Sequence, residues 1–447
     1  MKHNYLLTLI GLILPSLMCA QNLPLPAAVQ NDDLIASLAA DSKVNADSAL
    51  YVVSNWSRYP NNSKNALNYV YYYNDAVFGK VPVRVFVPAN YNKNIKTPCI
   101  IMLHGAVGQS KFSDIDSTGV NDDDMFFDAF KNKGYIIIRP IGDRSKKFDW
   151  VVDRFSSPAN PKPNLTYKAL TNILIALKSI LNIDDDRVFA FGHSDGSDGA
   201  VGLGVYSPDM FAAIIGYNSM LTNIFAYDYY IRNIKNRNLY LVHSDLDDIR
   251  PIQTTRDVIE KLKAEDNRIV YKEYRGYEHY DKHLNKDMPL AAIYMSDKGR
   301  YPYQHDIYWE TASDTLFNQC DWLKITGINT NLPAAAWQQN FDVKAYDKSI
   351  KAYRDNMLYY NYLSPSAVAK AHFANNIFDI KTSRVMQLQV LISPAMVNLN
   401  EPVTIKVNGK QVFNGKVSAD KQFILQNFKT NHDRRALWVK AIDVKVD

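Results

Sequence analysis

The sequence is poor in cysteine, with three among 447 residues. So few thiols exclude a fold that is held together by a disulfide framework. One of the three, Cys19, lies in an apolar stretch near the N-terminus. Cys99 lies in a second apolar run that is typical of a buried strand. We therefore expect Cys99 and Cys320 to be buried, unpaired thiols.

The chain also lacks a long tract of one charge, an internal repeat and a low-complexity segment. Lys and Arg number 51 and Asp and Glu number 46, and the two signs alternate along the chain. Such mixing is typical of a solvated surface and predicts no nucleic-acid partner. The apolar and charged fractions, 47% and 22%, are those of a soluble globular protein, and 447 residues suit two domains.

Long hydrophobic runs are missing apart from one at residues 5–18. This run is short for a bilayer, contains Pro15 and precedes a small residue, Ala20. It predicts a cleaved signal peptide over residues 1–20, and hence a secreted or periplasmic protein. An uncleaved anchor or a buried strand is the alternative. The rest of the chain predicts no stable membrane insertion.

We divide the remaining chain by its patterns. The predicted parts are an N-terminal helical extension at 21–75, a catalytic domain at 76–300, an aromatic connecting segment at 301–345 and a C-terminal β-rich domain at 346–447. Within 76–300, short apolar runs alternate with amphipathic stretches. This alternation predicts an open, mostly parallel and right-handedly wound sheet with helices on its faces.

The C-terminal part has the pattern of strands. Apolar runs lie at 385–392, 403–407, 411–413, 423–425 and 437–446. Asn408-Gly409 between two of these runs predicts a hairpin turn, because both residues tolerate positive φ. We expect a small β-sandwich. The preceding segment, 301–345, is rich in aromatic residues and loop-like.

The most informative stretch is 187–200, which reads RVFAFGHSDGSDGA. A buried strand is predicted to end at Gly192-His193-Ser194-Asp195-Gly196, which matches G-x-S-x-G. In that motif a strand turns sharply into a helix, and small residues two before and two after the serine avoid a clash. Ser194 is therefore the candidate nucleophile. The alternative is an ordinary strand-to-helix junction.

A serine hydroxyl needs a base, and the base needs an acid, each placed just after a strand. The acid is predicted to be Asp247 in LVHSDLDD, with Asp245 as the second choice. The base is predicted to be His279 in YRGYEH, ahead of His283, which falls in the next helix. Each of these side chains could instead cap or stabilise a loop.

Two backbone N–H groups are expected to form an oxyanion hole, those of Asp195 and Ala106. The long polar loop at 141–165 is expected to shape the substrate site. A metal pair at His279 and His283 lacks supporting ligands, so the sequence predicts no metal and no cofactor.

The segments LHGA, FGHSDG, LVHSDLDD and YRGYEH, in this order, resemble the α/β-hydrolase superfamily. They are most similar to the secreted esterase and prolyl-oligopeptidase-like group, which includes feruloyl esterases and polyhydroxybutyrate depolymerases. The resemblance covers residues 80–296 and implies a three-layer α/β fold. The stretch ISPAMVNLNEPVTIKVNGKQVFNGKV resembles a β-sandwich tail of some bacterial members. Ser197 stands where that group usually has a second glycine.

The resemblance implies a secreted serine hydrolase that cleaves a carboxylic ester, with a small-molecule or polysaccharide-linked substrate. A prolyl-oligopeptidase-like peptidase is the first alternative, although too few residues precede the sheet for that group's propeller. A non-catalytic polysaccharide-binding protein, using the aromatic segment, is the second.

Overall fold

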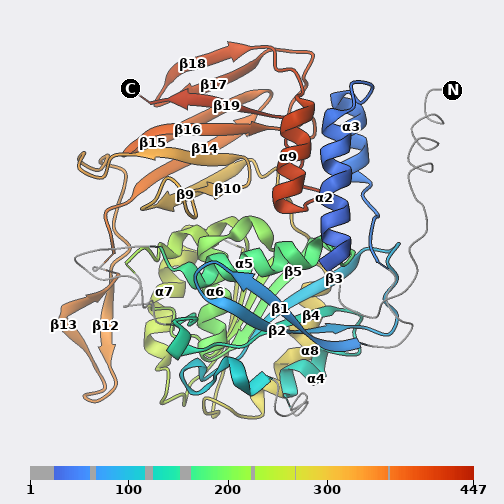
Figure 1. Cartoon of the computed structure of the whole chain (residues 1–447). Coiled ribbons are helices and arrows are strands. Elements are labelled where there is room, and N and C mark those ends of the chain that lie inside the picture. The colour runs from blue at the N-terminus through green and yellow to red at the C-terminus, as the bar shows by residue number, and fades with distance from the viewer. Residues whose placement is uncertain are drawn as a thin grey trace.

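The computed structural model describes residues 25–60, 67–115, 124–151, 163–222, 227–266, 268–360 and 363–446 (Figure 1). The predicted signal peptide at 1–20 lies outside these ranges. No helix within them combines the length and the apolar character that crossing a membrane demands.

An eight-stranded sheet forms the centre of the first half of the chain. Its order is β1-β2-β4-β3-β5-β6-β7-β8. The strands are β1 (Leu67–Asp75), β2 (Gly79–Val87), β3 (Thr97–Leu103), β4 (Ile136–Pro140), β5 (Ile183–His193), β6 (Ala213–Tyr217), β7 (Asn238–Ser244) and β8 (Ile269–Tyr274). β1 pairs with β2 and β2 pairs with β4 in antiparallel orientation, and β3 through β8 are parallel to one another. The predicted mostly parallel sheet is confirmed.

Helices cover both faces of this sheet. They are α4 (Met125–Phe130), α5 (Leu165–Lys178), α6 (Asp195–Tyr206), α7 (Ile252–Lys263) and α8 (His283–Ser296). Successive residues of β3 point to opposite faces, as a strand requires. Ile101 belongs to a buried cluster with α5, α6 and α7, whereas Ile100 and Met102 pack with α4 and α8. The apolar run that predicted a strand buried on both sides therefore separates two cores. Cys99 is buried in this strand, and Cys320 is also buried and free.

The N-terminal segment differs from its prediction in one respect. Helices α2 (Leu25–Ala40) and α3 (Ala46–Ser54) were expected, and the Asn45 side chain caps α3 by accepting the Ser48 N–H at 2.8 Å. However, β1 occupies the end of the predicted helical extension at 21–75 and pairs along its whole length with β2. The tyrosines at 69–73 are strand residues. Both helices lie against the C-terminal part of the chain (Figure 1).

The C-terminal part contains two further sheets and a hairpin. One sheet has the order β10-β11-β16-β19 and the other β18-β17-β15-β14-β9, while β12 and β13 pair alone. The strands are β9 (Asp306–Thr311), β10 (Gln319–Cys320), β11 (Leu323–Ile328), β12 (Val343–Asp347), β13 (Ala352–Tyr359), β14 (Ala367–Ala374), β15 (Ile377–Ser383), β16 (Val385–Ile392), β17 (Val403–Val407), β18 (Lys410–Gly415) and β19 (Lys440–Lys445). Both large sheets share one hydrophobic cluster.

Two sequence expectations for this part were wrong. The segment 301–345 is not only a connection, because β9 pairs with β14 and β11 pairs with β16. The strand predicted at 423–425 is the middle of a helix, α9 (Lys421–Asn431). Asp420 caps that helix, with its carboxylate accepting the N–H groups of Gln422 and Phe423. Three consecutive apolar residues fit a strand or a helix equally well, and the cap decides between them.

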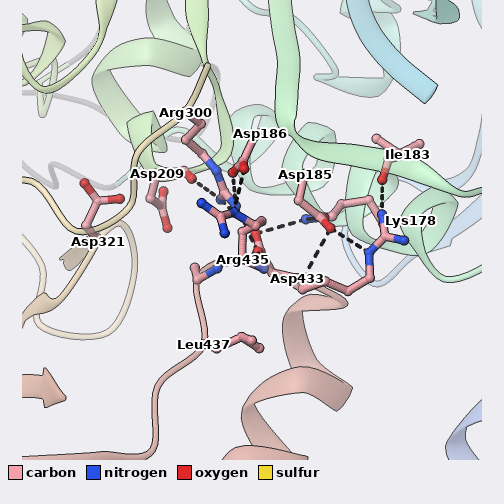
Figure 2. A network of polar contacts seen from close by, with 12 residues as sticks. Lys178, Ile183, Asp185, Asp186, Asp209, Arg300, Asp321, Asp433, Arg435 and Leu437 are labelled. Atoms are coloured by element: carbon pink, nitrogen blue, oxygen red, sulfur yellow. Dashed lines mark hydrogen bonds and ion pairs between the residues drawn. The ribbon is translucent and has the colours of Figure 1, made fainter. Parts of the chain in front are cut away.

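A buried network of charges joins the two halves of the chain (Figure 2). Asp433 accepts hydrogen bonds from Lys178 at 3.1 Å and from Arg300 Nη2 at 2.8 Å. Lys178 Nζ also lies 2.7 Å from Asp185 Oδ1, and Arg434 Nε lies 2.8 Å from Asp185 Oδ2. Lys178 and Asp185 belong to α5 and β5, whereas Asp433 and Arg434 follow α9. The two halves are therefore fixed to one another by ion pairs.

Asp209 lies at the edge of this network and faces Asp321 (Figure 2). Burial and the charge of Asp321 raise the pKa of Asp209 to about 6, against the attraction of Arg237 and Arg300. Because the folded pKa exceeds the ordinary value, the ionised carboxylate costs stability above pH 6, and the cost disappears as the pH falls toward 4. We expect Asp209→Asn to raise the free energy of unfolding at pH 8 by about 1–2 kcal/mol and to have no effect at pH 4.

Urea unfolding at the two pH values measures this effect. An equal shift at pH 8 and pH 4 would contradict an origin in ionisation. Asp443→Asn on the exposed face of β19 is the control, and it is expected to leave stability unchanged at both pH values.

Candidate active site

Ser194 occupies a strained turn between β5 and α6. Its φ and ψ are 57° and −126°, a conformation that few residues other than glycine adopt. A Cβ atom at Gly192 would lie 2.1 Å from the Gly196 carbonyl carbon, and one at Gly196 would lie 1.9 Å from Leu103 O. Both glycines of the motif are thus required by close backbone contacts. The predicted strand-turn-helix arrangement is present.

Three side chains from distant parts of the chain meet at this turn. The Ser194 Oγ lies 2.8 Å from His279 Nε2, and His279 Nδ1 lies 2.7 Å from Asp247 Oδ2. Ser194 follows β5, Asp247 follows β7 and His279 follows β8, so all three lie at the carboxyl edge of the parallel strands. Asp247 and His279 are buried, and Ser194 is partly accessible. The structure brings together the three residues that the sequence selected.

Asp247 is held as an ionised acceptor. Its Oδ1 accepts the N–H groups of Ile249 at 3.1 Å and Arg250 at 2.8 Å, and its Oδ2 accepts Asn218 Nδ2 at 2.7 Å. Burial alone would raise the pKa of Asp247. The hydrogen bonds from His243, His279, the Arg250 backbone and Asn218 outweigh it and hold the pKa far below the ordinary value. The carboxylate therefore stays charged beside His279.

Asn218 contacts Asp247 and was not identified from the sequence. Its amide nitrogen donates both to Asp247 and, at 2.5 Å, to Ser244 Oγ. It directly follows β6, at the same edge of the sheet as the other site residues, and that position is the only signal in the sequence.

A second histidine fixes the backbone of His279. His193 Nε2 lies 2.8 Å from the His279 carbonyl oxygen. Burial, above all, lowers the pKa of His193 to about 3, so this ring stays neutral near pH 7 and donates from Nε2 to the carbonyl. His193, which precedes Ser194 in the motif, thus helps to position the His279 imidazole that contacts Ser194.

The second-choice residues have other contacts. Asp245 Oδ1 accepts the Gly276 N–H at 2.7 Å and so caps the turn before His279. His283 begins α8, and its Nε2 lies 3.1 Å from Asn218 Oδ1. Burial lowers the pKa of His283 to about 4. Neither side chain contacts Ser194 within the described ranges.

The loop that carries Ala106 lies against the nucleophile. A Cβ atom at Gly105 would be 3.3 Å from Ser194 Cβ and 3.9 Å from its Oγ. Ala106 has φ 49° and ψ 42°, in the left-handed region. The next N–H group, that of Val107, donates to Asp195 Oδ2 at 2.9 Å. The Asp195 carboxylate therefore ties this loop to the start of α6, which places the two predicted oxyanion donors on adjoining segments.

Arg250 is the main residue that sequence reasoning missed. Its buried guanidinium donates from Nε to Ser194 Oγ at 3.3 Å and from its two terminal nitrogens to Asp195 and Asp198. A cation thus contacts the hydroxyl of Ser194 and, through Asp195, the loop of Ala106. The sequence shows only an arginine three residues after Asp247, since its carboxylate partners lie far away in the chain.

Ser197 departs from the pattern of the group that the sequence resembles, and its surroundings accommodate the hydroxyl. Its side chain is fully buried, and its Oγ has no hydrogen-bond partner among the described residues. A Cβ atom at Gly216 of β6 would lie 2.4 Å from that oxygen. The hydroxyl therefore occupies space that a glycine on the neighbouring strand leaves.

Because the Ser197 hydroxyl is buried without a partner, we expect Ser197→Ala to raise the free energy of unfolding by about 1 kcal/mol. Urea unfolding measures the change. Gly216→Ala is the matched opposite change, since its methyl group would collide with the serine, and it is expected to destabilise the protein. A destabilised Ser197→Ala variant would show that the hydroxyl has a partner.

The loop at 141–165 is described only in part. Trp150 is fully buried and packs on His104, with ring centroids 4.8 Å apart. The predicted contribution of residues 152–162 to a substrate site lies outside the described residues. Across the described ranges, no group of three or more His, Cys, Asp or Glu side chains is arranged to hold a metal ion.

No protein-family model and no curated protein matches the sequence. Among solved structures, the chain is similar to a thermostable esterase (21% identity, TM-score 0.42), to an S-formylglutathione hydrolase from Agrobacterium tumefaciens (14%, 0.41) and to a poly(3-hydroxybutyrate) depolymerase from Bordetella parapertussis (14%, 0.41). The alignments cover 52%, 53% and 57% of this chain and 63%, 97% and 96% of the others. The chain thus spans less than two thirds of the thermostable esterase. What can be said of its chemistry rests on the geometry of Ser194, His279 and Asp247.

Proposed function

We propose that the protein is a serine hydrolase of the α/β-hydrolase type that cleaves carboxylic esters. The observation that carries this proposal is the continuous hydrogen-bonded series from Ser194 through His279 to Asp247 at a strained strand-to-helix turn. A hydroxyl, an imidazole and a carboxylate in this order supply a nucleophile, a general base and a group that orients the base.

In this mechanism, Ser194 Oγ attacks the ester carbonyl carbon while His279 Nε2 takes the hydroxyl proton. Asp247 stabilises the resulting imidazolium. The N–H groups of Asp195 and Ala106 donate to the oxygen that becomes negative in the tetrahedral intermediate. His279 then returns the proton to the departing alcohol, which leaves an acyl group on Ser194. A water molecule then attacks the acyl carbon while His279 takes its proton, and His279 returns that proton to Ser194 Oγ as the bond between Oγ and the acyl group breaks and the acid leaves.

Arg250 is proposed to support the nucleophile. Its Nε–H contacts Ser194 Oγ, and a positive charge there favours the partly negative oxygen that forms during attack. Asp195 and Asp198 hold the guanidinium in place, so it can act without reorganising.

For the substrate, we propose an acyl group linked to a carbohydrate, such as acetyl or feruloyl, in a secreted or periplasmic setting. This choice follows the resemblance of the sequence to secreted esterases. A peptidase of the prolyl-oligopeptidase type is the alternative that the same three side chains would serve.

The test has two steps. A fluorophosphonate probe is expected to label the protein, and Ser194→Ala is expected to abolish labelling and to lower kcat/KM for p-nitrophenyl acetate by at least about a thousandfold. Ser296→Ala, an exposed serine at the end of α8, is the control and should retain both. Absence of labelling in a folded protein would overturn the serine-hydrolase proposal.

The second step separates the substrates. We expect acetylated or feruloylated xylan fragments to be hydrolysed faster than an X-Pro amide. Faster amide hydrolysis would favour the peptidase. If the probe labels Ser194 but no ester in the panel is cleaved, the carbohydrate assignment is wrong.

A further inference from the structure

A hollow of about 430 Å³ lies between the two halves of the chain. It is lined by two glutamines and by Arg232, Lys235, Glu265, Tyr308, Trp337 and Lys370. Arg232 and Lys235 come from a short 3-10 helix, Ile231–Asn236, and Glu265 follows α7. Tyr308 and Lys370 come from β9 and β14.

The walls of this hollow are fixed to one another. Asn236 Nδ2 donates to the Tyr308 carbonyl oxygen at 2.7 Å, and Asn233 Nδ2 donates to the Glu310 carbonyl oxygen at 2.8 Å. In return, the Glu310 N–H donates to Asn233 Oδ1 at 2.9 Å. These amides pair with the outer edge of β9 as a further strand would. The hollow is thus formed before any ligand binds, which lowers the entropic cost of binding.

The lining carries an excess of positive charge. Arg232 Nε and Lys235 Nζ share the single carboxylate of Glu265, at 3.1 and 2.9 Å. No carboxylate within the described ranges pairs with the Lys370 ammonium. Partial desolvation and the charges of Lys235 and Arg232 lower the pKa of the exposed Lys370, against the attraction of Glu265, as expected where like charges face one another. Three cations against one carboxylate leave room for an added negative charge.

Aromatic rings lie beside these cations. Lys370 Nζ is 4.9 Å from the centre of the Trp337 ring and 5.8 Å from that of Tyr308. Lys235 Nζ is 5.6 Å from the Tyr308 ring. An aromatic ring offers a flat apolar surface, and the two amide side chains of the lining supply hydrogen bonds. Charge, flat surface and amide groups together match a sugar ring that bears a carboxylate.

This hollow is not a part of the active site. The 3-10 helix at Ile231–Asn236 directly precedes the amino end of β7, whereas Ser194 and His279 follow the carboxyl ends of strands parallel to it. The seven residues of β7 separate the two edges by roughly 20 Å. A ligand here would bind apart from the bond that is cleaved.

We propose that this hollow is a binding site for a uronate residue of an acidic polysaccharide. The carboxylate of the sugar pairs with Lys235 and Lys370, and the ring packs against Trp337. The site holds the polymer without taking part in the chemistry at Ser194, so it stands whether or not the protein is an esterase.

The experiment uses the full-length Ser194→Ala protein and titrates trigalacturonate by isothermal calorimetry, with tryptophan fluorescence as a second readout. We expect saturable binding that weakens with added salt, and at least tenfold weaker binding of the neutral trisaccharide of galactose. Lys370→Gln should weaken binding about threefold to fivefold, and the Lys235→Gln/Lys370→Gln double variant about tenfold or more. Lys445→Gln, an exposed lysine of β19, should have no effect.

Any one of four results would overturn the proposal. One is equal binding of the neutral and acidic trisaccharides. Another is unchanged affinity in the lysine double variant. The third is displacement of trigalacturonate by inorganic phosphate at equal concentration, which would indicate a simple anion site. Trp337→Ala should abolish the fluorescence change and weaken binding, and retention of both would contradict the placement of the ring. Labelling of Ser194 in the otherwise native chain is a separate readout, so failure here would leave the esterase proposal untouched.

Discussion

Replacement of Arg250 by methionine is expected to lower kcat/KM for p-nitrophenyl acetate about a hundredfold. Methionine keeps much of the length of the side chain but removes the Nε–H that contacts Ser194 Oγ and the two N–H groups that hold Asp195 and Asp198. The hydroxyl of Ser194 then loses its cationic neighbour. The loop of Ala106 loses part of its support, because Asp195 accepts the Val107 N–H.

The same substitution leaves two carboxylates without their shared cation, so it should also destabilise the protein. The assay is therefore made well below the melting temperature, and the rate of fluorophosphonate labelling is measured beside kcat/KM. Both should fall together if Arg250 acts on the nucleophile. Arg250→Lys keeps a charge but not the planar set of donors, so it should recover less than about a tenth of the lost activity.

Arg256→Met provides the matched control. Arg256 lies in α7 and pairs with Glu273 at 2.7 Å, but its side chain is 46% exposed. Loss of this pair should leave kcat/KM unchanged and stability nearly so. An Arg250→Met enzyme with native labelling and turnover would show that the contact with Ser194 has no role in the reaction.

Arg250 also shows where prediction from the sequence ends. The strained turn at Ser194 was predictable because its constraints are local. They are two glycines at fixed spacing and an apolar strand before them. Asp247 and His279 were predictable because both follow strands of one parallel sheet, whose carboxyl ends share an edge. Arg250 gains its role only from Asp195 and Asp198, which lie more than fifty residues away.

The fold, too, was predictable where its determinants are local in the sequence. Short apolar runs separated by helices specify the central strands of the sheet, because these strands are buried on both faces. The secondary structure of short segments was harder to predict. The apolar triplet at 423–425 belongs to α9, and Asp420, which caps that helix, was the signal that favoured a helix. The strand at 306–311 alternates buried and less buried residues, but Tyr308 and Trp309 are adjacent aromatic residues and hid this alternation in the sequence; the strand at 323–328 alternates only over its first half.

The junction between the two halves could not be predicted from the sequence. Its charges are expected to have a large effect on the free energy of unfolding. We expect Asp433→Asn to lower the free energy of unfolding by about 3 kcal/mol. The change is nearly isosteric, but it leaves Lys178 and Arg300, whose side chains are 3% and 1% exposed, facing a neutral amide. Their remaining carboxylates, Asp185 and Asp186, compensate only in part.

Urea unfolding at pH 7, followed by tryptophan fluorescence and by the rate of p-nitrophenyl acetate hydrolysis, measures this loss. Asp443→Asn on exposed β19 is the control, where a bond to Gln389 should contribute little. The neighbours of Asp433 hold its pKa well below the ordinary value, so its stabilising effect is present at neutral pH and is lost as the pH falls through the acid range. The difference between the Asp433→Asn variant and the native protein should therefore shrink in acid. A midpoint unchanged at pH 7 would mean that the charges at this junction only balance their own desolvation, and that apolar contacts alone hold the two halves together.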